Sequence, residues 1–166
     1  MGDMRIGFGY DSHRFEAGRR LVLGGVDIPG ETGLRGHSDA DVVIHAVIDA
    51  LLGAAALGDI GSHFPDTDER WRGADSAKLL SAVVTEVGAA GWTVGNIDVT
   101  VICERPRIGP HVEAIRARLA ELLWPGEAGQ IGRVSVKGKT NEGMDDVGAG
   151  AGIEVHAVCL LKGKSE

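Results

Sequence analysis

Residues 37–61 read HSDADVVIHAVIDALLGAAALGDIG, and this stretch decides the fold. Its apolar residues recur three and four positions apart, which is the period of an amphipathic helix. Ser38 can cap the first turn, and Asp41, three residues later, suits the positive end of the helix dipole. The run Gly58-Asp59-Ile60-Gly61 ends the segment. We therefore predict a helix that begins at Ser38 and ends before Gly58.

Around this helix, strand and helix patterns alternate along the chain. Strands are predicted over 4–13, 97–103, 134–137 and 153–161, and Gly24-Gly25 between two short apolar runs predicts a hairpin. Further helices are predicted from 75 and from 110, where Pro110 suits a first helical position. The order predicts one α+β domain over residues 1–166, an α/β sandwich. It consists of a four-stranded sheet with helices on one face plus a small hairpin.

Composition narrows the class of protein. The chain has 166 residues and a formal net charge of -7, whereas a nucleic-acid binder or a protein of anionic membrane surfaces needs a basic face. The sequence starts without a signal-peptide core and contains no apolar run of the ~18 residues that span a membrane. Cys103 and Cys159 are too few for a disulfide framework. We expect a cytoplasmic protein.

Three residues form a candidate metal site. Asp11 and His13 share one face of the first predicted strand, on which Gly7 and Gly9 leave the surface open. His45 lies on the polar side of the helix. Two imidazoles and a carboxylate with a free fourth position suit a catalytic zinc ion. Metal-bound histidines usually donate their second N–H to a carboxylate, and Asp41 and Asp49 flank His45 at four-residue spacing. A solvated helix face explains the same spacing equally well.

Other polar clusters are candidate phosphate-binding segments. His37 and Ser38 lie at the predicted helix N-terminus, where free N–H groups attract phosphate, although Ser38 also reads as an ordinary cap. Residues 137–143, KGKTNEG, follow a strand, and Lys139 and Thr140 could hold phosphate while Glu142 binds magnesium. Residues 137–143 could equally form an ordinary polar turn. The acidic segment 59–68 could equally be a solvated loop without a binding role.

These motifs together resemble the 2-C-methyl-D-erythritol 2,4-cyclodiphosphate synthase family. The resemblance runs from Arg5 to about Leu161. It rests on Asp11-Ser12-His13, on His37-Ser38-Asp39-Ala40-Asp41 with His45, on the run 49–61, and on Phe64-Pro65-Asp66-Thr67-Asp68. It implies a lyase of the non-mevalonate isoprenoid pathway. It also implies a homotrimer whose active sites lie between subunits, with Zn²⁺ and a second ion, Mg²⁺ or Mn²⁺.

The resemblance also implies roles for individual residues. Asp11, His13 and His45 match the zinc ligands, Glu142 matches the ligand of the second ion, and His37 and Thr140 match transition-state stabilisers. The substrate-binding positions are Asp11, Ser12, His13, His37, Ser38, Asp59, Ile60, Gly61, Phe64, Pro65, Asp66, Thr67, Asp68, Cys103, Glu104, Arg105, Pro106, Arg107, Ile108, Gly109, Lys139, Thr140, Asn141 and Glu142. Among these, residues 103–109 and 139–142 match the family's pocket for the cytidine and the diphosphate of the substrate.

The sequence departs from the family near its end. Ala149 and Ala151 stand where relatives often carry Arg and Glu, and Asp146 stands where they carry Phe. The resemblance implies that relatives with this Arg and Glu can hold an isoprenoid diphosphate in an apolar cavity on the threefold axis. Without that cation we expect this chain to bind geranyl or farnesyl diphosphate poorly there, because charge-assisted hydrogen bonds of ~1.5–3 kcal/mol each are lost.

The reaction implied is intramolecular phosphoryl transfer that releases CMP from a cytidine diphosphate substrate. An anionic nucleophile needs position and charge neutralisation more than a base. Two rivals fit some of the same residues. A zinc phosphohydrolase would use Asp49 or Asp59 as general base. A trimeric binding module for nucleotides or isoprenoid phosphates would use zinc only as a clamp, although a structural zinc prefers four protein ligands.

Overall fold

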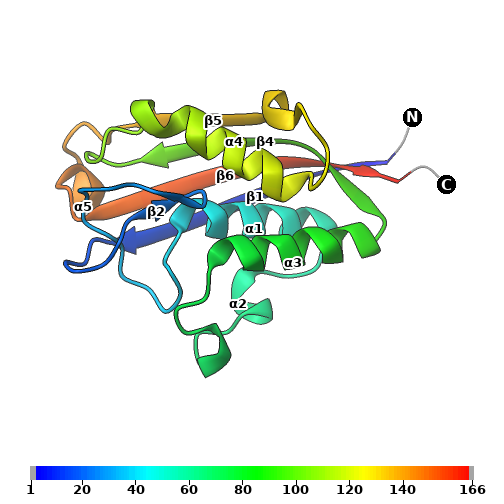
Figure 1. Cartoon of the computed structure of the whole chain (residues 1–166), viewed down its shortest axis with the longest axis horizontal. Helices are drawn as coiled ribbons and strands as arrows, with labels where there is room; N and C mark the ends of the chain where they lie inside the picture. Colours follow the sequence, from blue (N-terminus) through cyan, green and yellow to red (C-terminus); the bar gives the residue numbers. More distant parts are fainter. Residues whose placement is uncertain (1–2, 165–166) are drawn as a thin grey trace.

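The computed structural model describes residues 3–164 and places them in two layers, a sheet and a layer of helices that covers one of its faces (Figure 1). The elements, in chain order, are β1 (Met4–Arg14), β2 (Val22–Leu23), β3 (Val26–Asp27), α1 (Val42–Ala55), α2 (Ile60–His63), α3 (Ser76–Ala89), β4 (Trp92–Ile102), α4 (Val112–Leu123), β5 (Val134–Lys139), α5 (Asp145–Gly148) and β6 (Gly152–Gly163). Short 3₁₀ turns cover Glu69–Trp71, Gly109–His111 and Gln130–Arg133.

The sheet has the strand order β1-β6-β4-β5. β6 pairs antiparallel with both β1 and β4, while β4 and β5 run parallel. A separate two-stranded ribbon, β2-β3, forms the hairpin that Gly24-Gly25 predicts. The four-stranded sheet, the helices on one face and the hairpin are thus confirmed. Among residues 3–164, no helix combines the length and the apolar character that a membrane crossing requires.

Helix α1 is buried on nearly every side and lies directly on β1. A Cβ atom at Gly7 or Gly9 would collide with the carbonyl oxygens of Ala50 and Ala46, so the helix backbone occupies the space that side chains would fill. The expectation that these glycines leave their face of the strand open is therefore wrong. They close it instead, since only glycine allows two backbones to approach this closely.

The predicted start of α1 at Ser38 is also wrong. The helix begins at Val42, with Asp41 as its N-cap, whose side chain accepts from the backbone amides of Val43 and Ile44. Ala40 has a φ angle of 59°, in the left-handed region, and a right-handed helix cannot include such a residue. The first-turn amides at Val43 and Ile44 are thereby used by a protein carboxylate and are not free for phosphate.

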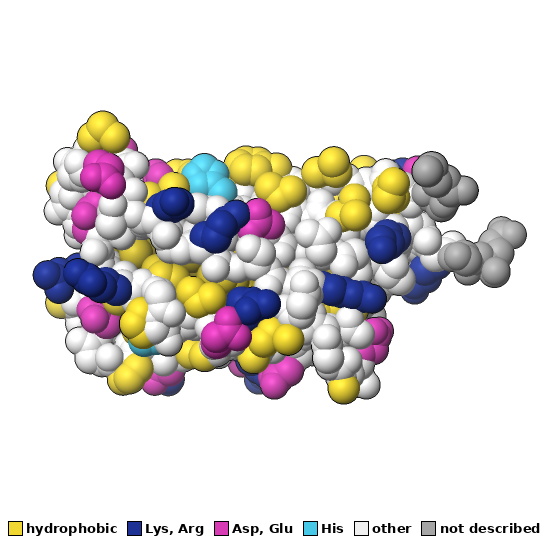
Figure 2. Space-filling view, turned by 90° about the horizontal axis from the view of Figure 1, so that it is seen from above, with side chains coloured by type: hydrophobic (Ala, Val, Ile, Leu, Met, Phe, Trp, Pro, Cys, Tyr) yellow, Lys and Arg dark blue, Asp and Glu magenta, His cyan; other side chains and the backbone are white. Residues whose placement is uncertain are grey.

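The other face of the sheet is uncovered, and it is apolar along β1. Large side chains of β1 and β6 are exposed there: Met4, Ile6, Phe8, Tyr10 and Val158, with exposed fractions of 57%, 75%, 61%, 44% and 43%. Hydrophobic side chains gather along the upper margin of Figure 2, the side away from the helices of Figure 1. One strand, β1, therefore presents glycines to α1 and large apolar side chains to the opposite face.

The close β1–α1 contact predicts opposite effects for two Gly→Ala substitutions. Gly9→Ala forces the helix away from the strand, and overpacking of this kind typically costs ~1–3 kcal/mol in the free energy of unfolding. Gly53 in α1 is exposed with open space around it, so Gly53→Ala is expected to raise that free energy by up to ~1 kcal/mol. Urea denaturation at equal protein concentration measures both. A Gly9→Ala protein as stable as the parent would contradict the contact.

Candidate functional site

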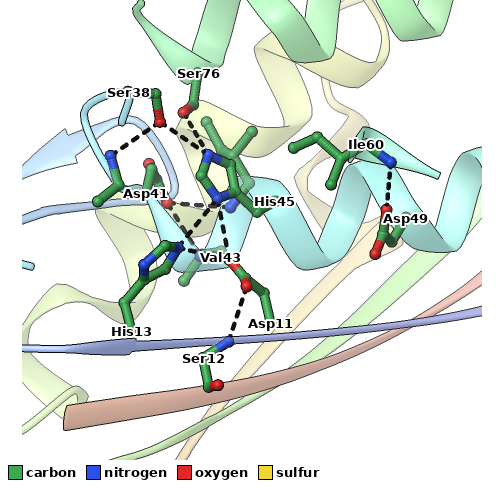
Figure 3. A network of polar contacts seen from close by, with 12 residues as sticks. Asp11, Ser12, His13, Ser38, Asp41, Val43, His45, Asp49, Ile60 and Ser76 are labelled. Atoms are coloured by element: carbon green, nitrogen blue, oxygen red, sulfur yellow. Dashed lines mark hydrogen bonds and ion pairs between the residues drawn. The ribbon is translucent and has the colours of Figure 1, made fainter. Parts of the chain in front are cut away.

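Three potential metal ligands converge between the end of β1 and the first turn of α1. Asp11 Oδ2 lies 3.0 Å from His13 Nε2 and 3.0 Å from His45 Nδ1, and the two imidazole nitrogens lie 3.3 Å apart. All three groups are partly buried. Figure 3 shows both rings and the carboxylate pointing toward one another. Within residues 3–164 this is the one group of three His, Cys, Asp or Glu side chains with such spacing.

The arrangement fits a tetrahedral metal ion. Two ligand atoms bound at ~2.0–2.1 Å to a tetrahedral zinc lie ~3.3 Å apart, close to the separations seen here. The outer nitrogen of His13, Nδ1, donates to the carbonyl oxygen of Arg35 at 2.7 Å, so that in the neutral ring Nε2 carries the lone pair. Two ring nitrogens and a carboxylate oxygen therefore form a donor set with room for a fourth ligand.

The carboxylate of Asp11 is held in its charged form. Burial alone would raise the pKa of Asp11. The hydrogen bonds that His13 and His45 donate to it when protonated, together with the charge of the protonated rings, outweigh burial and lower that pKa to about 2. Burial also acts against charging His13, yet its pKa is raised because Asp11 accepts from it and attracts it. Asp11 is thus an anion across the physiological range, as a metal ligand must be.

The hydrogen-bond partners of His45 differ from those that spacing predicts. Within the described residues, neither the Asp41 carboxylate nor the Asp49 carboxylate is hydrogen-bonded to the His45 ring. Asp41 is fully buried and accepts from four backbone amides, those of Gly24, Gly25, Val43 and Ile44. Asp49 accepts from the amide of Ile60 at 2.8 Å. The four-residue spacing predicted the wrong partners for His45, because backbone amides of helix caps and loops compete for the same carboxylates.

Instead, hydroxyl groups contact the outer nitrogen of His45. Nε2 lies 3.0 Å from Ser76 Oγ and 3.3 Å from Ser38 Oγ (Figure 3). Ser76 is the first residue of α3 and lies 31 positions along the chain from His45. The sequence predicts a helix from residue 75, and the resemblance to the family includes Gly73-Ala74-Asp75-Ser76, but neither marks Ser76 as a site residue.

A cavity of about 740 Å³ opens beside the three ligands. Most of the segments predicted to bind phosphate and substrate line it: His37, Ser38, Ile60, Gly61, Phe64, Pro65, Asp66 and Thr67. Arg35, Trp71 and Leu79 line it as well, and no sequence motif marks them as site residues. The buried His37 Nε2 and Trp71 Nε1 have no hydrogen-bond partner among the described residues, so the wall carries polar atoms without protein partners.

Among the predicted substrate residues of segments 11–13, 37–38 and 59–68, three lie outside this lining. Asp59 caps α2 in a reciprocal pair with Ser62, and Asp68 caps the 3₁₀ turn Glu69–Trp71 and pairs with Arg70. Ser12 faces a smaller cavity near α5. Asp146, also near that cavity, pairs with Arg14 at 2.7 Å. The acidic residues of 59–68 therefore divide into two that shape the loop and one, Asp66, that faces the cavity.

A second cavity, of about 570 Å³, lies where β4 and β5 end. It is lined by the predicted nucleotide segment, Cys103, Glu104, Arg105, Pro106, Arg107, Ile108 and Gly109, with Gly138, Lys139 and Thr140. Glu104 accepts from the amide of Asn141 at 2.9 Å, and Glu142 accepts from the hydroxyl of Thr140 at 3.3 Å. No residue lines both cavities, and Glu142 is not part of the Asp11-His13-His45 group.

Comparison with known proteins agrees with this geometry. The model of the YgbB family matches residues 4–162. A 2-C-methyl-D-erythritol 2,4-cyclodiphosphate synthase of Trichlorobacter lovleyi is 53% identical, over 95% of this chain and 98% of its own. One from Salinibacter ruber is 54% identical, over 96% and 99%. A solved structure of IspF from Plasmodium falciparum in complex with CDP superposes with a TM-score of 0.84 at 32% identity and covers 99% of each chain.

The agreement spans sequence, fold and nearly the full length of each relative. The chain belongs to the YgbB family, together with these 2-C-methyl-D-erythritol 2,4-cyclodiphosphate synthases of isoprenoid biosynthesis.

Proposed function

We propose that this chain converts 4-diphosphocytidyl-2-C-methyl-D-erythritol 2-phosphate into 2-C-methyl-D-erythritol 2,4-cyclodiphosphate and CMP. The observation that carries the proposal is the convergence of Asp11, His13 and His45 on the wall of a cavity large enough for a phosphorylated tetrol. We further propose Zn²⁺ for these ligands, and Mg²⁺ or Mn²⁺ at Glu142. Bound there, such cations would act as Lewis acids that neutralise charge on the diphosphate.

The bonds balance without a base. An oxygen of the 2-phosphate attacks the β-phosphorus, the bond from that phosphorus to the bridging oxygen breaks, and CMP leaves with that oxygen. The nucleophile is already an anion, so the protein has to supply position and compensating charge. His37 and Ser38, at the cavity wall, are suited to hold the 2-phosphate by donated hydrogen bonds. Ile60, Gly61 and the 64–67 segment would enclose the tetrol and exclude water.

Two observations favour transfer over hydrolysis. The carboxylates nominated as general bases for a phosphohydrolase are both occupied, Asp49 by the amide of Ile60 and Asp59 by Ser62. Neither is among the residues that line the cavity. A water molecule beside the three ligands therefore has no free carboxylate from these two positions to take its proton.

The test of function is product identity. The protein is incubated with the cytidine diphosphate substrate, Zn²⁺ and Mg²⁺, and the reaction is followed by phosphorus NMR. We expect CMP and a cyclic diphosphate in equal amounts. Two linear phosphates in place of the cyclic product would indicate hydrolysis, and unchanged substrate would leave only a binding role.

His45→Ala removes one of three metal ligands. We expect the purified variant to hold almost no zinc after dialysis, and its turnover to fall ~10³-fold, because the Lewis acid contributes several kcal/mol to the transition state. Zinc content is measured by atomic absorption and turnover by CMP release. His111→Ala is the matched control, since His111 lies outside both cavities. Full zinc content in His45→Ala would refute the ligand assignment.

We also propose a homotrimer with active sites between subunits. The apolar side chains exposed on the open face of the sheet support an interface there, because isolated soluble chains rarely expose so many together. The two cavities support shared sites, because the metal and nucleotide residues that the reaction needs together line separate cavities in one chain.

Mixed trimers test the shared site. His45→Ala and Glu142→Ala chains, each inactive alone, are unfolded together and refolded. If each site takes its zinc ligands from one subunit and its nucleotide residues from the next, roughly a quarter of the sites in random trimers are intact. Recovery of activity in that proportion is the expected result. Absence of any recovery in trimers shown by mass spectrometry to be mixed would contradict sites between subunits.

A further inference from the structure

The outer side of His45 is bound by a buried chain of polar groups that begins at Ser76. Ser76 is fully buried, and its Oγ lies 3.0 Å from His45 Nε2. On its other side, Ser76 is held by one carboxylate. Asp39 Oδ2 accepts from the backbone amide of Ser76 at 3.0 Å, and Asp39 Oδ1 accepts from its hydroxyl. Asp39 thus accepts hydrogen bonds from both the amide and the hydroxyl of Ser76.

These two hydrogen bonds fix the direction of the Ser76 hydroxyl. A serine has one hydroxyl proton, and an ionised carboxylate can only accept. The proton of Ser76 therefore points to Asp39, and the lone pairs of Ser76 Oγ face His45. It follows that His45 Nε2 carries a proton and donates it to Ser76.

The consequence for the metal site lies at the other ring nitrogen. In a neutral imidazole with the proton on Nε2, Nδ1 holds a lone pair. Nδ1 is the atom of His45 that faces Asp11 and His13. His13 is arranged in the mirror sense, because its Nδ1 donates to Arg35 and its Nε2 faces the centre. The two rings thus present lone pairs to the same point although they use different nitrogens.

Ser38 cannot replace Ser76 in this role. Its Oγ is farther from Nε2, at 3.3 Å, and accepts from the amide of Ala40 at 3.1 Å. No carboxylate fixes the direction of its hydroxyl proton among the described residues. Ser38 lines the cavity and keeps that proton for a ligand phosphate, whereas Ser76 does not line it.

We propose that Asp39 and Ser76 are positioning residues that hold His45 as the Nε2–H tautomer and so pre-organise the metal ligands. The inference rests on the metal site of the proposed function. Asp39 acts through Ser76, and Ser76 acts through His45. Neither touches the substrate or the reacting atoms in this scheme.

Zinc affinity without substrate is the first readout, measured by competition with a chelator. Ser76→Ala is expected to weaken zinc binding by ~10–100-fold, the usual effect of losing the partner of a metal-bound histidine. Ser76→Thr keeps the hydroxyl and should retain affinity to within about threefold of the parent. Ser81→Ala is the matched control, because Ser81 lies on the same helix and its hydroxyl donates only to Ala77.

A double-mutant cycle shows whether Asp39 acts through Ser76. In Asp39→Asn, the new side-chain NH₂ group faces a backbone N–H donor, of Ser76 or of Asp41, in either orientation of the amide. One oxygen of Asp39 accepts from the Ser76 amide, and the other accepts from the Ser76 hydroxyl and the Asp41 amide. We expect weaker zinc binding in Asp39→Asn alone. In the Ser76→Ala background the same change should have little further effect.

Nitrogen-15 NMR of the zinc-loaded protein gives a spectroscopic readout. The parent should show a His45 Nε2–H resonance protected from exchange with water, and Ser76→Ala should lose that protection. Three results would overturn the inference: unchanged zinc affinity in Ser76→Ala, additive losses in the double variant, or reduced affinity with an unchanged Nε2–H resonance. If the parent itself binds no zinc, the proposed metal site fails, and the inference with it.

Discussion

The contact between the backbones of β1 and α1 is the constraint on which the rest of the structure depends. Gly7 and Gly9 let the carbonyl oxygens of Ala50 and Ala46 approach the strand with no side chain between them. Because the strand and helix meet so closely, a ligand pair at the end of the strand and a histidine one turn into the helix come within hydrogen-bond distance. Bulkier residues in β1 would separate them by the thickness of a side-chain layer.

A second constraint sets where along α1 the histidine falls. Asp41 is buried and joins the hairpin amides of Gly24 and Gly25 to the first turn of the helix. Burial raises its pKa to about 6, while the amide donors favour its charged form. The carboxylate thereby ties the β2-β3 ribbon to the start of α1, four residues before His45. The position of His45 depends on this tie as well as on the strand beneath it.

The sequence was sufficient to predict the architecture and the cluster of Asp11, His13 and His45, but not the residues that contact this cluster from behind. Periodicity and turn residues identified the sheet strands, the hairpin and the helix that starts after Asp75. They placed the start of α1 too early, because no sequence pattern predicts the left-handed backbone conformation of Ala40. They also chose Asp41 and Asp49 as partners of His45. The observed partner, Ser76, comes from another helix, and contacts between distant segments leave no trace in local spacing.

One face of β1 requires glycine and the other carries large apolar side chains, so the structure is sensitive to the register of this strand. Residues 7 and 9 face the helix, while Ile6, Phe8 and Tyr10 face the open side of the sheet. Side chains alternate along a strand, so a slip of one residue against β6 would exchange the two faces completely. Three large side chains would then meet the helix backbone, and the carboxylate and imidazole would leave the cavity. A single-residue insertion or deletion within this short segment would therefore remove the packing and the ligand set together, whereas a two-residue change would preserve the facing.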